Sequence, residues 1–328
     1  MFYLECDSDS ANLNFALEKY AMEELDLSDE YFMFWRTAPT LMVGRYQNTL
    51  AEINMPVAKA NNINIIRRIT GGGTIYTDLN GWQFSFIAKN TGTNQPKQID
   101  FEHFTKPILD ALHTLGVPAR LSGRNDLVVE GKKISGNAQY VRKGVTLHHG
   151  SLLFDTNLEN LVRALTPDDE KLISKGIQSV RQRVANIAEY MEDKISTLEF
   201  RDVMVRHLLK NAQTHTLTSA DISRINEIKQ AQFDTWEWNF GNNPKYNISK
   251  EKKFAGGKLC VQSYVDRGKI SDIRFYGDFF AKEGLDKLAL KLLACPYKED
   301  EIKKVLRENN AEHYFYNISV DDILSCII

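Results

Sequence analysis

The sequence predicts an α+β protein with a mixed sheet, and two features of the chain support this fold class. Short runs rich in β-branched and aromatic residues recur up to residue 154, whereas the pattern from residue 157 to about 232 is mostly helical. Strand-like and helical segments occur again near the C-terminus. A chain that places its strands first and its helices later is typical of an α+β domain.

The first element is an amphipathic helix over residues 11–25, for which Ser10 or Asn12 is a suitable N-cap. A second helix spans Phe101 to Leu115, since Gly116 and Pro118 end its pattern. The runs that favour strands cover residues 31–36, 40–44, 63–68, 74–78, 83–88, 127–129, 133–141 and 145–154.

The chain changes character over residues 233–253, which combine aromatics, a Gly-Asn-Asn-Pro string and a run of charges. Such a segment is typical of a linker or of a segment that caps a domain. Residues 258–277 then alternate around Asp266-Arg267-Gly268-Lys269 as a hairpin does, and helical patterns follow near 283–294 and 298–309. We therefore predict two domains, residues 1–246 and a small α/β unit over residues 247–328.

Composition excludes several classes of protein. The 328 residues are 43% hydrophobic and 26% charged with a net charge of −2, so no strong field favours nucleic acid or a membrane surface. No apolar run approaches the roughly 20 residues that span a bilayer. The start MFYLECDSDS lacks the pattern of a secretory signal, and the cysteines are scattered at Cys6, Cys260, Cys295 and Cys326. A reduced, cytoplasmic location and packing roles for the cysteines follow.

The stretch RRITGGGTIYTD, residues 67–78, is the first candidate site. Its three glycines match neither the dinucleotide nor the Walker pattern, but bare amides of such a loop can face an anion. Arg67 or Arg68 could meet a phosphate or a carboxylate through two parallel hydrogen bonds. The alternative is a glycine-rich turn beside two surface arginines, and local evidence leaves both interpretations open.

The second candidate is SGRNDLVVEGKKISGNAQY, residues 122–140. Alternation along a strand would place Lys133, Ser135 and Asn137 on one face, where a solvated surface is the default explanation. Gly131 and Gly136 oppose that default, because glycine in a strand marks a bulge or a close backbone approach. The polar and charged residues of this segment are Arg124, Asn125, Asp126, Lys132, Lys133, Ser135 and Asn137.

The third candidate is LHHGSLLF, residues 147–154, in which His148 and His149 point to opposite faces of a strand. At most one of them can face any given site, and a lone strand histidine is more often a satisfied core residue. No Asp, Glu or His grouping has the spacing of metal ligands, so we predict no structural metal.

Together and in this order, RRITGGGTIYTD, GRNDLVVEGKKISGNAQ and HHGSLLF resemble the lipoate–protein ligase family, ATP-dependent enzymes of the biotin/lipoate ligase fold. The resemblance continues through KGIQSVRQRVANI (175–187) and TWEWNFGNNP (235–244), and includes a small C-terminal accessory domain. It implies ATP, Mg²⁺ and lipoate, a lipoyl-AMP intermediate, and transfer to a lysine of an acceptor domain. The acceptor would be an E2 subunit of a 2-oxoacid dehydrogenase or a glycine cleavage H-like protein. We expect a monomer.

The resemblance also implies roles for individual residues. Lys133 matches the lysine that contacts both lipoate and nucleotide, and Arg68 matches the arginine that holds nucleotide or adenylate. The other residues expected at the nucleotide are Gly73, Thr74, Ile75, Tyr76, Asn125 and Asp126, with Asp126 a candidate Mg²⁺ ligand. The residues expected at lipoate, besides Lys133, are Thr70, Gly71, Gly72, Ser135, Gly136 and His149.

Two departures from the family pattern stand out: Thr77 replaces the usual histidine, and Asn80-Gly81 replaces the usual Gly-Asn. They put local contacts and acceptor preference in doubt, but not the adenylation chemistry. Three alternatives stay open. A lipoyl or octanoyl transferase of the same fold normally needs a cysteine, and no motif here contains one. A biotin ligase would carry a Gly-Arg-Gly-Arg string, which is missing. A non-catalytic binder of lipoyl-adenylate would have lost turnover.

Overall fold

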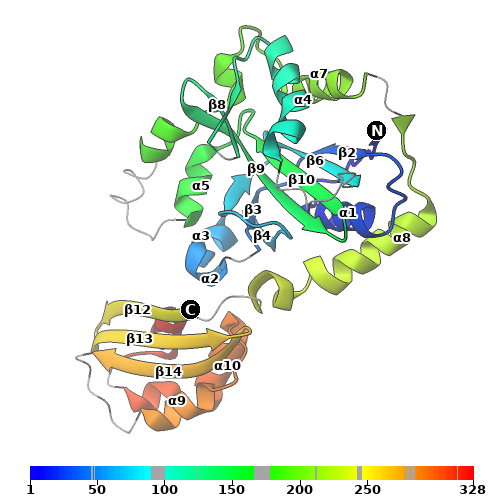
Figure 1. The fold of residues 1–328 in the computed structure, drawn as a ribbon. Coiled ribbons are helices and arrows are strands. Elements are labelled where there is room, and N and C mark those ends of the chain that lie inside the picture. The colour runs from blue at the N-terminus through cyan, green and yellow to red at the C-terminus, as the bar shows by residue number, and fades with distance from the viewer. Residues whose placement is uncertain are drawn as a thin grey trace. The chain divides into compact units, whose positions relative to one another are not determined.

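The computed structural model describes the chain except residues 46, 48, 90–99, 124, 166–177, 211–212, 242–245, 278, 280, 282–284 and 316. It divides into two compact units (Figure 1). The first comprises Met1–Gln47 and Glu52–Thr235, and the second comprises Asn48–Ala51 and Trp236–Ile328. None of the helices described is long and apolar enough to cross a membrane.

The first unit is built on an eight-stranded sheet with the order β11-β1-β2-β6-β10-β9-β8-β7 among the described residues. β1 runs parallel to both of its neighbours, whereas the pairs from β2 to β7 are antiparallel, so the predicted mixed sheet is confirmed. Its strands are β1 (Phe2–Tyr3), β2 (Tyr31–Trp35), β6 (Trp82–Lys89), β7 (Arg120–Ser122), β8 (Asp126–Val129), β9 (Lys132–Arg142), β10 (Val145–Leu152) and β11 (Gln213–Thr214).

Helices cover both faces of this sheet, because alternate residues of its central strands are apolar or aromatic on each side (Figure 1). On one face, Phe34 and Phe86 join a core with α4 (Phe101–Thr114) and α7 (Thr197–Leu208). On the other face lies α1, and α8 packs on α1. The bounds are α1 (Ala11–Glu23) and α8 (Ser219–Ile228), and the Ser10 hydroxyl caps α1 by accepting from the Leu13 amide.

A smaller three-stranded sheet carries the glycine run. β3 (Thr40–Val43) lies between β4 (Asn64–Arg67) and β5 (Ile75–Thr77), parallel to the first and antiparallel to the second. The glycines therefore form the connection between the two outer strands of this sheet. Its apolar side packs on α3 (Met55–Ala60) and α5 (Leu158–Leu165).

The predicted helical stretch from residue 157 onward is largely confirmed where the structure describes it. It contains α5, α7 and α8, the 3₁₀ turn η1 (Ile187–Tyr190) and the π-helical turn η2 (Lys229–Phe233), interrupted by the short β11. The start of the family-like segment 175–187, residues 175–177, lies outside the described residues.

The second unit is an antiparallel sheet of β12 (Tyr246–Phe254), β13 (Gly257–Asp266) and β14 (Lys269–Gly277). The predicted hairpin at Asp266–Lys269 is confirmed, with Arg267 and Gly268 at φ of 48° and 71° as a tight hairpin turn requires. One face of the sheet packs on α9 (Asp286–Leu292), α10 (Glu299–Glu308), η4 (Ala311–Tyr314) and α11 (Val320–Ile327).

The boundary between the units lies between Thr235 and Trp236, ahead of the predicted position near residue 246. Trp236 packs with the core of the second unit, its ring lies over Gly268, and the Lys298 ammonium stands 4.7 Å from the ring centroid. Of the two interpretations of residues 233–253, a linker or a segment that caps a domain, the linker is wrong from Tyr246 onward, where β12 begins. β12 is an edge strand dense in lysine, a composition that protects sheet edges and hides the strand signal.

Candidate active site

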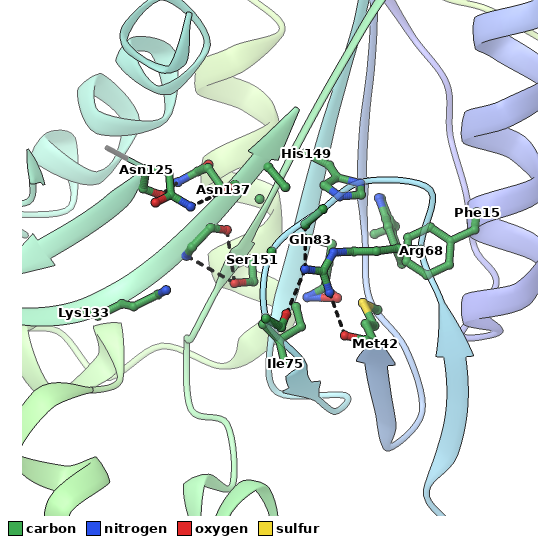
Figure 2. Close-up of a pocket in the computed structure, with 17 residues that line it drawn as sticks. Phe15, Met42, Arg68, Ile75, Gln83, Asn125, Lys133, Asn137, His149 and Ser151 are labelled. Carbon is green, nitrogen blue, oxygen red and sulfur yellow. Dashed lines mark hydrogen bonds between the residues drawn. The ribbon is translucent and has the colours of Figure 1, made fainter. Parts of the chain in front are cut away.

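A pocket opens in the first unit where the glycine loop faces the ends of β6, β9 and β10. Its volume is about 530 Å³, including the part open to solvent. Figure 2 shows Lys133 on one side of this pocket and Phe15 and Met42 on the other. Trp35 also lines it, so the pocket joins a cationic mouth to an apolar and aromatic interior. Such a cavity suits a ligand with a charged head and an apolar tail.

Most of the predicted site residues meet at this pocket. Those that line it are Lys133, Arg68, Gly71, Gly72, Gly73, Ile75, Asn125, Gly136 and His149. The others lie beside or behind it: Thr70, Thr74, Tyr76, Asp126 and Ser135. The Thr74 hydroxyl donates to Gln47 Oε1 at 3.0 Å, and the Tyr76 hydroxyl accepts from Asn160 Nδ2 at 3.1 Å. Ser135 is fully buried and accepts from Asn137 Nδ2 at 3.3 Å.

Lys133 stands at the mouth of the pocket as a half-exposed cation. Its Nζ lies 2.8 Å from Asp126 Oδ1, and 37% of each side chain is exposed. A methyl group at Gly136 would lie 2.8 Å from Nζ, so the end of the lysine side chain occupies the space that the glycine leaves. Within the described part of the chain the ammonium is thus held by one surface-type ion pair, which an anionic ligand can replace at little cost.

The strand around Lys133 contains the bulge that Gly131 and Gly136 suggested. Val128 pairs with Lys133 and Leu127 pairs with Ser135, which leaves Ile134 as an extra residue in β9. Ser135 and Asn137 still share a face, since Asn137 Nδ2 donates to the Ser135 hydroxyl, so the predicted shared face is wrong for Lys133. Lys133 and Asn137 nevertheless both line the pocket. The interpretation as a solvated face is also wrong, because Ser135 and Asn137 are buried. Arg124 lies outside the described residues.

Both arginines of the opening motif are buried, so the interpretation as two surface arginines is wrong. Arg68 donates from Nε to the Thr70 hydroxyl at 3.1 Å and from NH1 to the Met42 carbonyl at 2.7 Å. Its NH2 donates to the carbonyls of Gly71 and Gly73, both at 2.8 Å. Burial lowers the pKa of Arg68 to about 10, which still leaves it protonated at neutral pH. Arg67 holds the carbonyls of residues 44, 45 and 47 in the same way.

The glycine loop is shaped by close backbone approaches. Gly72 has a φ of 98°, and a methyl group at Gly44 would lie 1.9 Å from the Gly72 carbonyl oxygen. Arg68 draws the carbonyls of Gly71 and Gly73 to itself. Nothing lies within 4 Å of the position that a methyl group at Gly73 would take, so the backbone there is open to an approaching ligand.

The two histidines of β10 face opposite sides of the sheet, as alternation predicts. His148 is buried among phenylalanines, with its ring 5.0 Å from that of Phe104 and nearly parallel to it. Burial lowers the pKa of His148 to about 3, so it is a neutral core residue. His149 lines the pocket, with Nε2 2.8 Å from the Thr70 hydroxyl and Nδ1 3.1 Å from Glu18 Oε1.

Thr77 and the Asn80-Gly81 turn, the two departures from the family pattern, support the pocket wall from behind. The Thr77 hydroxyl accepts from Gln83 Nε2 at 3.0 Å, and Gln83 lines the pocket. Asp78 Oδ1 accepts from the Asn80 amide at 3.0 Å, which closes a local turn. A methyl group at Gly81 would lie 2.7 Å from the Thr156 hydroxyl oxygen. The departure at Thr77 therefore changes the residue that supports Gln83, and not a residue that lines the pocket.

Replacing Thr77 by valine is expected to lower the free energy of unfolding by about 1–3 kcal/mol, because the buried Gln83 amide loses its acceptor while the shape is kept. Chemical denaturation of the purified variant measures this change. Thr37→Val is the matched control, since Thr37 is equally buried and its hydroxyl has no hydrogen-bond partner in the described part of the chain. Equal effects of the two substitutions would contradict the role of the Thr77 hydroxyl.

Several pocket residues were not predicted from the sequence. Phe15, Trp35 and Met42 lie in an amphipathic helix and in apolar strands, where they are indistinguishable from core residues. Gln83 carried a usable signal, because it is a long polar side chain in an otherwise apolar strand. Gly150 and Ser151 lie within the third motif and were passed over.

The described part of the chain offers few groups that could bind a metal ion or act as a reactive thiol at this pocket. Among the described residues, no three His, Cys, Asp or Glu side chains cluster as metal ligands would. None of the four cysteines lines the pocket, at least as far as the described chain shows. Burial raises the pKa of the Cys6, Cys295 and Cys326 thiols, which disfavours the reactive thiolate.

Comparison with known proteins follows the same division of the chain. The model of the lipoyl protein ligase A/B catalytic domain matches residues 10–209, and that of the bacterial lipoate protein ligase C-terminus matches residues 243–327. Lipoate-protein ligase LplJ of Bacillus subtilis is 40% identical over 320 residues, which cover 96% of each chain.

Solved structures agree with this match. A bi-partite lipoate protein ligase of Thermoplasma acidophilum, described together with its E2 lipoyl domain, is 28% identical with a TM-score of 0.66, over 75% of this chain and 97% of the other. A lipoate-protein ligase A bound with ATP is 25% identical with a TM-score of 0.62, over 74% of this chain and 98% of the other. The resemblance of the three motifs is thus confirmed: the chain belongs to the lipoate–protein ligase family of enzymes.

Proposed function

We propose that this protein uses ATP to convert lipoate to lipoyl-AMP with release of pyrophosphate, and then transfers the lipoyl group to a lysine of an acceptor domain. The observation that carries the proposal is the single pocket that joins an apolar interior to Lys133 and the open backbone at Gly73. The solved relative bound with ATP supports nucleotide binding in this family.

In the first half-reaction a lipoate carboxylate oxygen attacks the α-phosphorus of ATP. The bond between this phosphorus and the oxygen that links it to the β-phosphate breaks, and pyrophosphate leaves. Negative charge concentrates where carboxylate and α-phosphate meet, so a fixed cation there stabilises the transition state. Lys133 is the half-exposed cation of the pocket mouth, and its compact ammonium can bridge both groups. Arg68 lines the same pocket, and its guanidinium donates to the carbonyls of Met42, Gly71 and Gly73. Its contact with nucleotide or adenylate stays a prediction.

In the second half-reaction the amine of the acceptor lysine attacks the acyl carbon, AMP leaves, and the amine gives up a proton. The mixed anhydride is already activated, so positioning supplies most of what this step requires. No protein nucleophile is needed, in keeping with the position of the cysteines outside the pocket lining of the described chain. Every pocket residue belongs to the first unit, so we assign both half-reactions to it and treat the second unit as accessory.

The carboxylate of Asp126, beside the pocket mouth, is suited to bind Mg²⁺. Mg²⁺ is usually bound through one or two carboxylates together with substrate phosphates, and Asp126 is a half-exposed carboxylate next to Lys133. Bound there, the ion would neutralise phosphate charge. Asp126→Asn is expected to raise the Mg²⁺ concentration needed for half-maximal ATP–pyrophosphate exchange by about tenfold. Asp110→Asn, a surface change at the Lys106 ion pair, is the control. An unchanged Mg²⁺ requirement in Asp126→Asn would remove Asp126 from this role.

The acceptor we propose is a lipoyl domain of an E2 subunit or a glycine cleavage H-like protein, and the protein would act as a cytoplasmic monomer. The Thermoplasma relative, described with an E2 lipoyl domain, supports the first of these acceptors.

The test is incubation of the purified protein with ATP, Mg²⁺, lipoate and a panel of acceptor domains, read by intact mass. A mass increase equal to one lipoyl group, dependent on ATP and lipoate, is the expected result. Transfer from an acylated carrier protein without ATP would identify a transferase instead. Tight binding of lipoyl-AMP without modification of any acceptor would identify a non-catalytic binder. Absence of lipoate-dependent ATP–pyrophosphate exchange would reject adenylation itself.

A further inference from the structure

A carboxylate lies fully buried beneath the pocket and belongs to none of the sequence motifs. Glu18 of α1 has no exposed surface, although a glutamate is almost never buried unless it is paired. Its helix packs against β6 and β10, which turns the side chain toward the sheet. Leaving a charge in such a place is costly unless hydrogen bonds satisfy it, so its partners show what it does.

The Glu18 carboxylate accepts hydrogen bonds from two elements of the sheet. The Ser85 hydroxyl donates to Oε1 at 2.5 Å, and Ser85 Oγ itself accepts from the Trp35 indole at 2.9 Å. His149 Nδ1 lies 3.1 Å from Oε1 and 3.3 Å from Oε2. A carboxylate oxygen accepts from His149 when Nδ1 carries the proton, and the remaining contacts of His149 support this arrangement.

The proton on Nδ1 determines the direction of the next two hydrogen bonds. In a neutral imidazole with Nδ1 protonated, Nε2 is an acceptor, and the Thr70 hydroxyl lies 2.8 Å from it. The Thr70 hydroxyl can then donate to His149 while its oxygen accepts from Arg68 Nε at 3.1 Å. Each donor in the series Arg68, Thr70, His149 faces an acceptor, and Glu18 ends the series.

At the end opposite Glu18, the series of hydrogen bonds reaches the glycine loop. Arg68 is the group that holds the carbonyls of Gly71 and Gly73. In Figure 2, Arg68 lies between His149 and Met42, whose carbonyl takes another of its donors. The orientation of this guanidinium depends on Nε meeting the Thr70 oxygen, and hence on the state of His149. Hydrogen-bond networks of this kind stabilise one arrangement when every member is satisfied.

We propose that Glu18 is a positioning residue for the reaction: it holds His149 in the neutral form protonated at Nδ1, and through Thr70 and Arg68 it maintains the conformation of the glycine loop. The catalytic consequence rests on the proposed function, whereas the form of His149 does not. Loss of the acceptor at position 18 releases Nδ1. The imidazole then protonates at Nε2 and donates to Thr70, whose own proton loses its acceptor.

The direct test is ¹⁵N NMR of histidine side chains in the full-length protein, which distinguishes protonation at Nδ1 from protonation at Nε2. The chain has seven histidines, so the signals of His149 are assigned by their loss in His149→Asn. We expect protonation at Nδ1 in the wild type and at Nε2 in Glu18→Leu. Glu18→Gln keeps a side-chain oxygen as acceptor and is expected to retain the wild-type form. Wild-type signals that show Nε2 protonation would overturn the proposal, with no variant needed.

Exchange kinetics supply the second readout. Glu18→Leu is expected to raise the KM for lipoate by about tenfold while Glu18→Gln restores most of it, because the lost interaction is a single buried hydrogen bond. Glu23→Gln on the same helix removes an exposed ion pair with Arg142 and is the matched control. If Glu18→Leu does not fold, Thr70→Val cuts the series one step later. Thr70→Val should keep Nδ1 protonated and still raise the KM for lipoate. An unchanged KM for lipoate in whichever of the two variants folds would refute the proposal.

The two readouts separate the possible failures. A wild-type protein without lipoate-dependent exchange rejects the proposed function, and the NMR result still decides the form of His149. Normal exchange with Nε2 protonated in the wild type rejects only the role of Glu18.

Discussion

Lys133→Ala is expected to lower kcat/KM for lipoate-dependent ATP–pyrophosphate exchange by about 10²- to 10³-fold. Lys133 lies at the mouth of the pocket with its ammonium 2.8 Å from Asp126, and a ligand carboxylate and phosphate would replace that carboxylate. Alanine leaves the charge that builds up between them without compensation. Initial rates of exchange over a range of lipoate and ATP concentrations measure the loss.

Lys132→Ala is the matched control for this experiment. Lys132 precedes Lys133 in β9, but does not line this pocket, so the variant removes the same charge from the same strand. It is expected to keep wild-type exchange, and both variants should unfold at the wild-type temperature because each side chain is partly exposed. A Lys133→Ala protein that folds normally and exchanges at the wild-type rate would exclude Lys133 from adenylation.

Gly44→Ala is expected to destabilise the first unit by about 1–3 kcal/mol and to impair exchange at the same time. The added methyl group would lie 1.9 Å from the Gly72 carbonyl oxygen. This oxygen is a backbone atom, and the loop that contains it is anchored by the paired strands β3, β4 and β5. The loop between β4 and β5 must therefore move, and this displaces the carbonyls of Gly71 and Gly73, which accept hydrogen bonds from Arg68. Thermal unfolding measures the first effect, at about 2–4 °C for each kcal/mol in a unit of this size.

Gly73→Ala separates the two effects of that substitution. No atom lies within 4 Å of the position that its methyl group would take, so thermal unfolding should stay close to that of the wild type. The group would nevertheless project toward the open side of the loop, and we expect weaker binding of lipoate or ATP. A Gly44→Ala protein as stable as the Gly73→Ala protein would show that the loop yields without cost.

Much of the fold follows from local patterns. Most of the strands, the helices predicted over residues 11–25 and 101–115, and the 266–269 hairpin were visible because their signals are short-range: alternation, helical spacing and turn residues. The edge strand β12 was missed because Asn, Ser, Glu and three lysines occupy six of its nine positions. Trp236 was assigned to a linker or a segment that caps a domain, because nothing local shows that its ring packs against Gly268.

The candidate site was only partly visible for a related reason. Lys133 and the glycine run are recognisable in one dimension, since spacing and residue type are all that they require. The extra residue Ile134 changed which neighbours face the pocket, and a bulge is a property of the strand pair rather than of one strand. Gln83, Trp35 and Met42 became site residues only once their strands were placed around the loop.

The sequence by itself determined the class of fold, the three motifs and their order, and with them the family. Only the tertiary structure decided what the charged groups do. Arg68 was expected to hold an adenylate, which stays a prediction, and the structure adds that it holds the glycine loop, since its acceptors come from Met42, Thr70, Gly71 and Gly73. Glu18 resembles a polar residue on an amphipathic helix, yet it is buried against His149, 131 positions away. Hydrogen-bond partners and burial are set by which strands and helices pack together, and no local pattern contains that information.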